Sequence, residues 1–147
     1  MSVIFVDADG CPVKDEVCRV AERHGLEVKL VSNTWMRTPS VAWLELVVVD
    51  DGFDAADDWI VEQAAERDVV VTADIPLAAR CLKKGARVLG PKGRIFTENS
   101  IGNALAGREA SAYLREMGVM TGGPAPFTKR DRSRFLQRLE EVARLCL

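Results

Sequence analysis

Aspartates follow the apolar runs at the beginning and in the middle of this chain. The run Val3–Val6 leads directly into Asp7 and Asp9, and the run Val69–Ala73 leads into Asp74. Such β-branched runs are typical of strands that are buried on both faces of a parallel sheet. Open α/β sheets bind their ligands at the carboxyl ends of the strands. The pattern therefore predicts that these aspartates lie together at a ligand-binding edge.

Metal binding is the chemistry that such aspartates favour. Carboxylates gathered at one edge repel one another unless a cation joins them, and Mg²⁺ or Mn²⁺ takes oxygen ligands of this kind. We expect the ion between Asp7 and Asp74, with Asp9 or Asp58 contributing through water. Two such ions about 4 Å apart activate a water and stabilise the leaving oxygen of a phosphodiester. The sequence thus predicts a metal-dependent phosphodiesterase or ribonuclease with these four aspartates as its catalytic residues.

Each of these acids also has a structural explanation. Asp9 and Asp74 stand where the N-caps of the following helices are expected. Asp54 and Asp57 fit a capping pair at the start of a mid-chain helix, and Asp58 lies just beyond them. The chain contains no Ser-His-Asp set, no P-loop and no glycine pattern for dinucleotide binding. The sequence alone therefore leaves two roles open for these aspartates, namely helix capping and catalysis.

Basic residues gather at the beginning of the last predicted helix, Lys129–Leu145. A Gly/Pro-rich loop at residues 121–128 leads into it, and the segment 127–147 holds six Lys and Arg against three acids in a chain of net charge −2. Backbone N–H groups and positive charge at a helix start suit a phosphate, so we expect contacts with RNA here. An ordinary solvated helix face is the alternative. The residues expected to bind phosphate are Lys129, Arg130, Arg132 and Arg134.

Predicted strands and helices alternate along the chain. The expected strands cover residues 3–6, 28–31, 46–49, 69–72 and 87–89. The expected helices begin near Pro12, Asp54, Asp74, Glu98 and Lys129. Gly25 is expected to end the first helix in a left-handed conformation. This alternation predicts a single three-layer α/β domain spanning residues 1–147, in which helices cover both faces of a mostly parallel sheet.

Composition narrows the class of protein. Hydrophobic residues make up 48% and charged residues 29% of the chain, as in ordinary globular proteins. No stretch has the apolar length of a membrane span, and the first residues lack the pattern of a signal peptide. The four cysteines form no C-x-x-C pair and there is one histidine, which argues against a zinc site. We expect a cytoplasmic protein with reduced cysteines.

Four segments carry a resemblance to a known family, namely Val6–Lys14, Asp51–Trp59, Val71–Ala78 and Met120–Phe127. They resemble the bacterial YaiI/YqxD family of uncharacterised proteins, which is related to PIN-like nuclease domains. The resemblance covers nearly the whole chain and implies a PIN-like sheet with the strand order 3-2-1-4-5. Asp7 and Asp74 would then end adjacent strands. PIN nucleases often carry a further acid after the fifth strand, whereas this chain has Gly90–Arg94 there.

Two other functions remain open. The segment Asp7–Gly10 resembles the first motif of haloacid-dehalogenase-type phosphatases, in which Asp7 would be the nucleophile and Asp9 the acid/base. Ser32, after the second strand, would stand in for that family's second motif. The chain could instead be a non-catalytic module that binds RNA or a protein. Metal-dependent cleavage of RNA would separate a nuclease from a binding module, and a trapped acyl-phosphate on Asp7 would identify a phosphatase.

Overall fold

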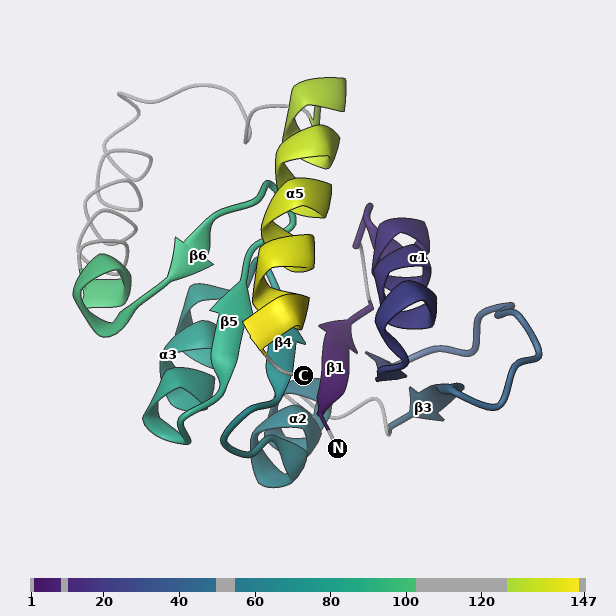
Figure 1. The fold of residues 1–147 in the computed structure, drawn as a ribbon. Coiled ribbons are helices and arrows are strands. Elements are labelled where there is room, and N and C mark those ends of the chain that lie inside the picture. The colour runs from purple at the N-terminus through teal and green to yellow at the C-terminus, as the bar shows by residue number, and fades with distance from the viewer. Residues whose placement is uncertain (1, 9–10, 50–54, 103–126, 146–147) are drawn as a thin grey trace, which may run out of the picture.

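The sheet confirms the predicted α/β class. The computed structural model describes residues 2–8, 11–49, 55–102 and 127–145, and within them six strands form one sheet in the order β3-β2-β1-β4-β5-β6 (Figure 1). All neighbours pair in parallel except β5 and β6. The first five strands therefore have the predicted order. The strands are β1 (Val3–Asp7), β2 (Glu27–Ser32), β3 (Leu44–Val48), β4 (Val69–Val71), β5 (Arg87–Leu89) and β6 (Ile95–Phe96).

Strand β6 is the element that the sequence pattern did not predict. A strand of two residues has no alternation of apolar and polar positions to recognise. It forms because the chain reverses direction directly after β5, where the N–H of Gly90 donates to the carbonyl of Arg94 at 2.8 Å. Gly93 closes this turn with a φ of 90°. The reversal brings Leu89 of β5 opposite Ile95, so that the two strands pair antiparallel.

Helices cover both faces of the sheet, as the alternation predicted. Helices α1 (Lys14–His24) and α5 (Lys129–Leu145) lie on one face, and α2 (Ala55–Gln63) and α3 (Ile75–Lys83) lie on the other (Figure 1). Residues 98–102 are also helical. The described residues thus form three layers, with the sheet between two layers of helices.

Local signals placed most helix ends correctly. Gly25 follows α1 in the left-handed conformation, with φ 68° and ψ 32°. Thr128 and Asp131 form a capping box at the start of α5, because each side chain accepts the backbone N–H of the other residue, at 3.0 and 3.1 Å. The start of α1 differs from the prediction: Pro12 lies in a turn, and the helix begins at Lys14.

The central strand β1 is buried on both faces. Ile4 and Val6 belong to the apolar cluster under α1 and α5, which also contains Phe135. Phe5 points to the opposite face and packs with Ile60 of α2. Two close-packed cores therefore hold β1 and fix the direction of Asp7, the residue that ends it.

Four predictions lie partly or wholly outside the described residues. Asp9 and Asp54 are outside them, as are residues 121–126 of the Gly/Pro-rich loop and residues 103–117 of the helix expected from Glu98. No helix in the described part of the chain is long and apolar enough to cross a membrane.

Candidate functional site

Asp7 lies at the point where the winding of the sheet changes direction. From β1 the chain continues to β2 and β3 on one side of β1, whereas β4 and β5 lie on the other side. β1 and β4 are parallel neighbours, with Val6 opposite Val71. The next residues along the two strands, Asp7 and Thr72, therefore stand side by side at the carboxyl edge. Crevices at such switch points are the usual ligand sites of open α/β sheets.

Thr72 links the two aspartates that end these strands. Its hydroxyl donates to Oδ2 of Asp7 at 3.1 Å and accepts the backbone N–H of Asp74 at 3.0 Å. The Thr72 side chain is buried, with 2% of the residue exposed. Since one hydroxyl contacts both residues, it fixes the Asp7 carboxylate relative to the start of α3. This role of the Thr72 hydroxyl was not predicted from the sequence.

Asp74 confirms the structural explanation given for it, because it is the N-cap of α3. Its Oδ1 accepts the backbone N–H of Leu77 at 2.9 Å, and Pro76 stands in the first turn of the helix. A carboxylate has two oxygens with about four lone pairs in total. Capping α3 through one oxygen is therefore compatible with metal binding by the same side chain.

Asp58 does not join Asp7 and Asp74. Its Oδ1 forms an ion pair of 3.0 Å with Arg80 of α3, and it lines an open hollow with Glu62 and Val48. No three His, Cys, Asp or Glu side chains within the described residues gather closely enough to hold a metal ion. Of the four predicted catalytic aspartates, Asp7 and Asp74 are thus linked through Thr72, by the Asp7 carboxylate and the Asp74 backbone N–H, and Asp9 is outside the described residues.

Cys11 precedes α1, and its partly buried side chain packs against the core under α1 and α5. Burial raises the pKa of the Cys11 thiol above its ordinary value, and the nearby carboxylates of Asp7 and Glu16 raise it further. The N–H of Val13 and the ammonium of Lys14 act in the opposite direction but are weaker than the burial. The thiol therefore remains protonated at neutral pH, which agrees with a packing role.

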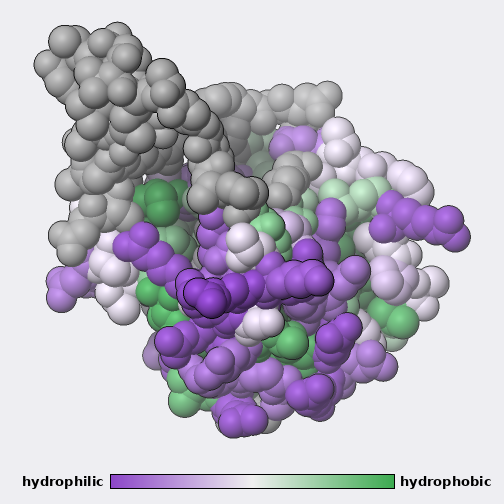
Figure 2. Space-filling model, turned by 90° about the horizontal axis from the view of Figure 1, so that it is seen from above, coloured by the Kyte–Doolittle hydropathy of each residue, from purple (hydrophilic) through white to green (hydrophobic). Residues whose placement is uncertain are grey.

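The basic start of α5 lies at the same end of the sheet as the strand ends. In Figure 1, β1, β4 and β5 point upward and the first turns of α5 rise above them. Figure 2 views the molecule from above, and hydrophilic side chains gather on that face. Lys129 and Arg130 are exposed there, and neither forms an ion pair within the described residues. The structure thus leaves these two cations available to an anion.

Arg132 is instead bound to the protein. Its Nη1 donates to Oε1 of Glu16 at 2.6 Å and to the carbonyl of Pro12 at 3.2 Å. The guanidinium also lies 5.1 Å from the ring centre of Phe127. Glu16 is buried, with 7% exposed, and its Oε2 has no hydrogen-bond partner within the described residues. Arg132 therefore compensates a buried carboxylate and joins α5 to α1, a role that the sequence did not suggest.

We expect Arg132→Ala to lower the free energy of unfolding by about 1–3 kcal/mol, because it leaves the Glu16 carboxylate buried without its partner. Urea denaturation checks this value. Arg130→Ala is the matched control, since this exposed side chain should change stability by less than about 0.5 kcal/mol. Equal stability of the two variants would contradict the structural role of Arg132.

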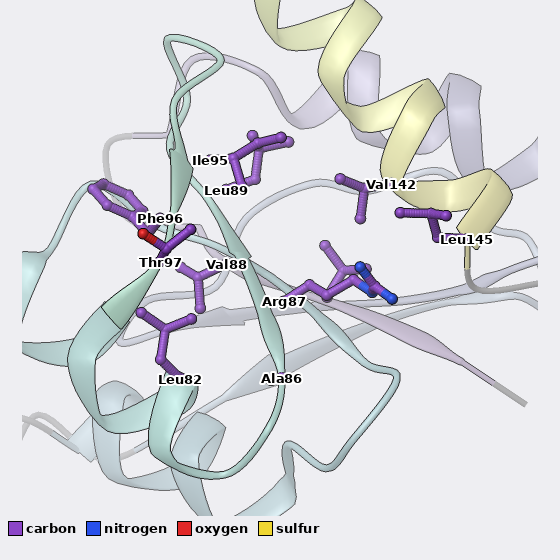
Figure 3. A pocket seen from close by; sticks show the side chains of 11 residues that line it. Leu82, Ala86, Arg87, Val88, Leu89, Ile95, Phe96, Thr97, Val142 and Leu145 are labelled. Carbon is purple, nitrogen blue, oxygen red and sulfur yellow. The ribbon is translucent and has the colours of Figure 1, made fainter. Parts of the chain in front are cut away.

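An apolar pocket lies near the β6 edge of the sheet. It has a volume of about 270 Å³ and lies between β5, β6 and the end of α5 (Figure 3). Leu82, Val88, Phe96 and Val142 contribute apolar side chains to it, and Arg87 contributes the charged one. This lining offers no carboxylate to a cation. The carboxyl edge at Asp7 and Asp74 is therefore the better candidate for a site of chemistry.

Comparisons with known proteins agree with the resemblance noted in the sequence. The family model described as "Uncharacterized BCR, YaiI/YqxD family" matches residues 5–144. A UPF0178 protein of Agrobacterium fabrum is 55% identical over 141 residues, which cover 96% of this chain and 92% of that protein. A UPF0178 protein of Parvibaculum lavamentivorans is 56% identical over 142 residues, which cover 97% and 93%.

A UPF0178 protein of Rhizobium meliloti is 54% identical over 142 residues, which cover 97% of both chains. No solved structure matches. The names of these relatives state no activity. The match over nearly the whole chain and the identity above one half with several relatives show that this protein belongs to the YaiI/YqxD family.

Proposed function

We propose that this protein is a metal-dependent phosphodiesterase that acts on RNA. The observation that carries the proposal is the Thr72 hydroxyl, which contacts both Asp7 and Asp74 at the switch point of the sheet. Two strands that are distant in sequence thereby present carboxylates at one edge. Enzymes that cleave phosphodiesters commonly build their metal sites from carboxylates of this kind.

The side chains present at the edge fit Mg²⁺ or Mn²⁺ better than a softer metal. Asp7 and Asp74 offer oxygen ligands, and Mg²⁺ is usually held by one or two carboxylates together with waters and phosphate oxygens. The protonated thiol of Cys11 is a poor ligand. The only histidine, His24, is bound to Glu140 at the opposite end of α1. The donor chemistry therefore selects a hard cation.

Asp7 and Asp74 would hold this ion, and Thr72 would keep the Asp7 carboxylate in place. When bound, the metal lowers the pKa of a coordinated water and neutralises charge on the scissile phosphate. Asp9 follows Asp7 by two residues and is our first choice to orient the attacking water. Asp58 remains a second choice for this role, because its carboxylate is paired with Arg80.

The start of α5 would bind the phosphates that flank the cleaved bond. Lys129 and Arg130 are exposed at the same end of the sheet as Asp7, and Arg134 follows on the same helix. Arg132 contributes by holding α5 against α1 through Glu16. Backbone phosphates of RNA are recognised by such cations without regard to base sequence. The arrangement therefore supports contact with the nucleic-acid backbone.

Hydrolysis of a labelled single-stranded RNA by the purified protein tests the proposal. We expect cleavage with Mn²⁺ or Mg²⁺ and none with EDTA, and we expect affinity to fall as the salt concentration rises. Simultaneous Lys129→Ala and Arg130→Ala should weaken binding and reduce its salt dependence. Salt-dependent binding without any cleavage would favour the non-catalytic module. Release of phosphate with an acyl-phosphate on Asp7 would favour the phosphatase.

A further inference from the structure

An exposed tryptophan stands close to the carboxyl edge of the sheet. Trp35 is 75% exposed, which is the largest exposure of any large hydrophobic side chain among the described residues. It follows β2 by three residues, and β2 is the parallel neighbour of β1, with Val31 opposite Asp7. The connection from β2 to β3 therefore leaves the sheet beside the candidate site. The indole ring lies near the beginning of this connection.

The residues on both sides of Trp35 are held in place. Before it, the backbone N–H of Thr34 donates to the buried Ser32 hydroxyl at 3.1 Å. After it, Met36 packs against the core under α1 and α5, and its sulfur lies 3.7 Å from Nζ of Lys14. These contacts tie the loop to β2 and to the first turn of α1. Trp35 is exposed between these two anchored neighbours.

Positive charge accompanies the exposed ring. Lys14 reaches the loop from α1, and Arg37 follows Trp35 by two residues and is exposed. On the other side of the first turn of α1, the carbonyl of Pro12 accepts a hydrogen bond from Arg132 of α5. The first turn of α1 thus lies between Trp35 and the basic start of α5.

We propose that Trp35 is a stacking platform for an unpaired base of single-stranded RNA. This inference rests on the proposed action on RNA and adds the preference for single strands. Aromatic side chains beside a basic surface bind single strands by stacking on base faces, and this contact tolerates any base. A duplex keeps its bases stacked on one another, so it has no face to offer to Trp35. The sequence alone did not indicate stacking, because no run of aromatic residues interleaves the basic residues of α5.

The test measures RNA binding in EDTA, so that hydrolysis does not enter the result. Fluorescence anisotropy would compare a labelled RNA of about twelve nucleotides, its duplex and an abasic oligonucleotide of the same length. Trp35→Ala should weaken binding to the single strand by about tenfold or more, and Trp35→Phe should retain most of the affinity. Val41→Ala, in the same loop and 39% exposed, is the matched control. The thermal midpoints of all variants should equal that of the wild type.

The abasic oligonucleotide separates stacking from phosphate contacts. It should bind more weakly than the normal strand, and Trp35→Ala should not weaken it further. The inference is overturned if Trp35→Ala leaves single-strand affinity unchanged, or if it weakens the abasic and the normal strand equally. It is also overturned if Trp35 supports binding to anionic lipid vesicles and not to RNA. If the Trp35→Ala variant still cleaves RNA, the proposed function remains intact. If binding depends on Trp35 but no cleavage occurs, only the hydrolytic role is contradicted.

Discussion

Asp7→Asn and Asp74→Asn should each lower the affinity for Mn²⁺ by more than about a hundredfold and reduce RNA cleavage to background. Loss of a residue that only supports a metal ligand already costs about 10–100-fold in affinity, and these two carboxylates are the proposed ligands themselves. Isothermal titration calorimetry with Mn²⁺ checks the affinity, and the labelled RNA checks the cleavage. An amide keeps the shape of the side chain but removes the negative charge that the cation requires.

The fold should survive these substitutions. Asparagine caps a helix about as well as aspartate does, so Asp74→Asn preserves the hydrogen bond to the N–H of Leu77. Asp74→Ala is the contrasting variant, because it removes the cap as well and should cost about 0.5–2 kcal/mol of stability. A loss of metal binding in Asp74→Asn at unchanged stability therefore assigns the effect to the charge and not to the capping role.

Thr72 provides a graded control for the same site. Thr72→Val removes the hydroxyl that contacts Asp7 and Asp74, and it should reduce metal affinity by about 10–100-fold. Thr72→Ser keeps the hydroxyl and should remain closer to the wild type. Wild-type affinity for Mn²⁺ in both Asp7→Asn and Asp74→Asn would exclude this edge as the metal site.

Gly93→Ala should lower the free energy of unfolding by about 2–5 kcal/mol, the largest loss of stability that we expect from a single methyl group. A Cβ at Gly93 would lie 2.8 Å from the backbone carbon of Arg134 and 2.9 Å from the backbone nitrogen of Phe135. The backbone of α5 cannot yield as a flexible side chain would. Gly93 also has a φ of 90°, a conformation that residues with a Cβ rarely adopt.

Two other glycines separate the effect of close contact with α5 from the effect of the positive φ. Gly25 has a positive φ, and a Cβ added there would meet no atom within 4 Å, so Gly25→Ala should cost only about 1–2 kcal/mol of conformational strain. Gly102 lies in a helical segment, and a Cβ added there would meet no atom of the described residues within 4 Å, so Gly102→Ala should be neutral or stabilise by up to about 1 kcal/mol. Urea denaturation of the three variants checks the order. A Gly93→Ala variant no less stable than Gly25→Ala would contradict close contact between this turn and α5.

The sequence predicted those features that depend on neighbouring residues. Strongly apolar runs identified the buried strands, and the residue types at Gly25 and Asp74 identified helix ends. Such signals arise because caps and strand faces are set by side chains a few positions apart. The resemblance to a known family supplied the order of the strands, which placed Asp7 beside the β4 unit.

The tertiary structure alone decided which polar groups meet across the fold. Thr72 contacts Asp7 over 65 positions, and Arg132 contacts Glu16 over 116, so no spacing rule relates them. Asp58 was expected near the aspartates but is paired with Arg80, since α2 and α3 pack side by side. The sequence by itself thus determined which aspartates follow the strands, and it determined the helices and strands with most of their ends. Long-range packing decided which partner each charged side chain has, because such contacts depend on the position of whole helices and strands.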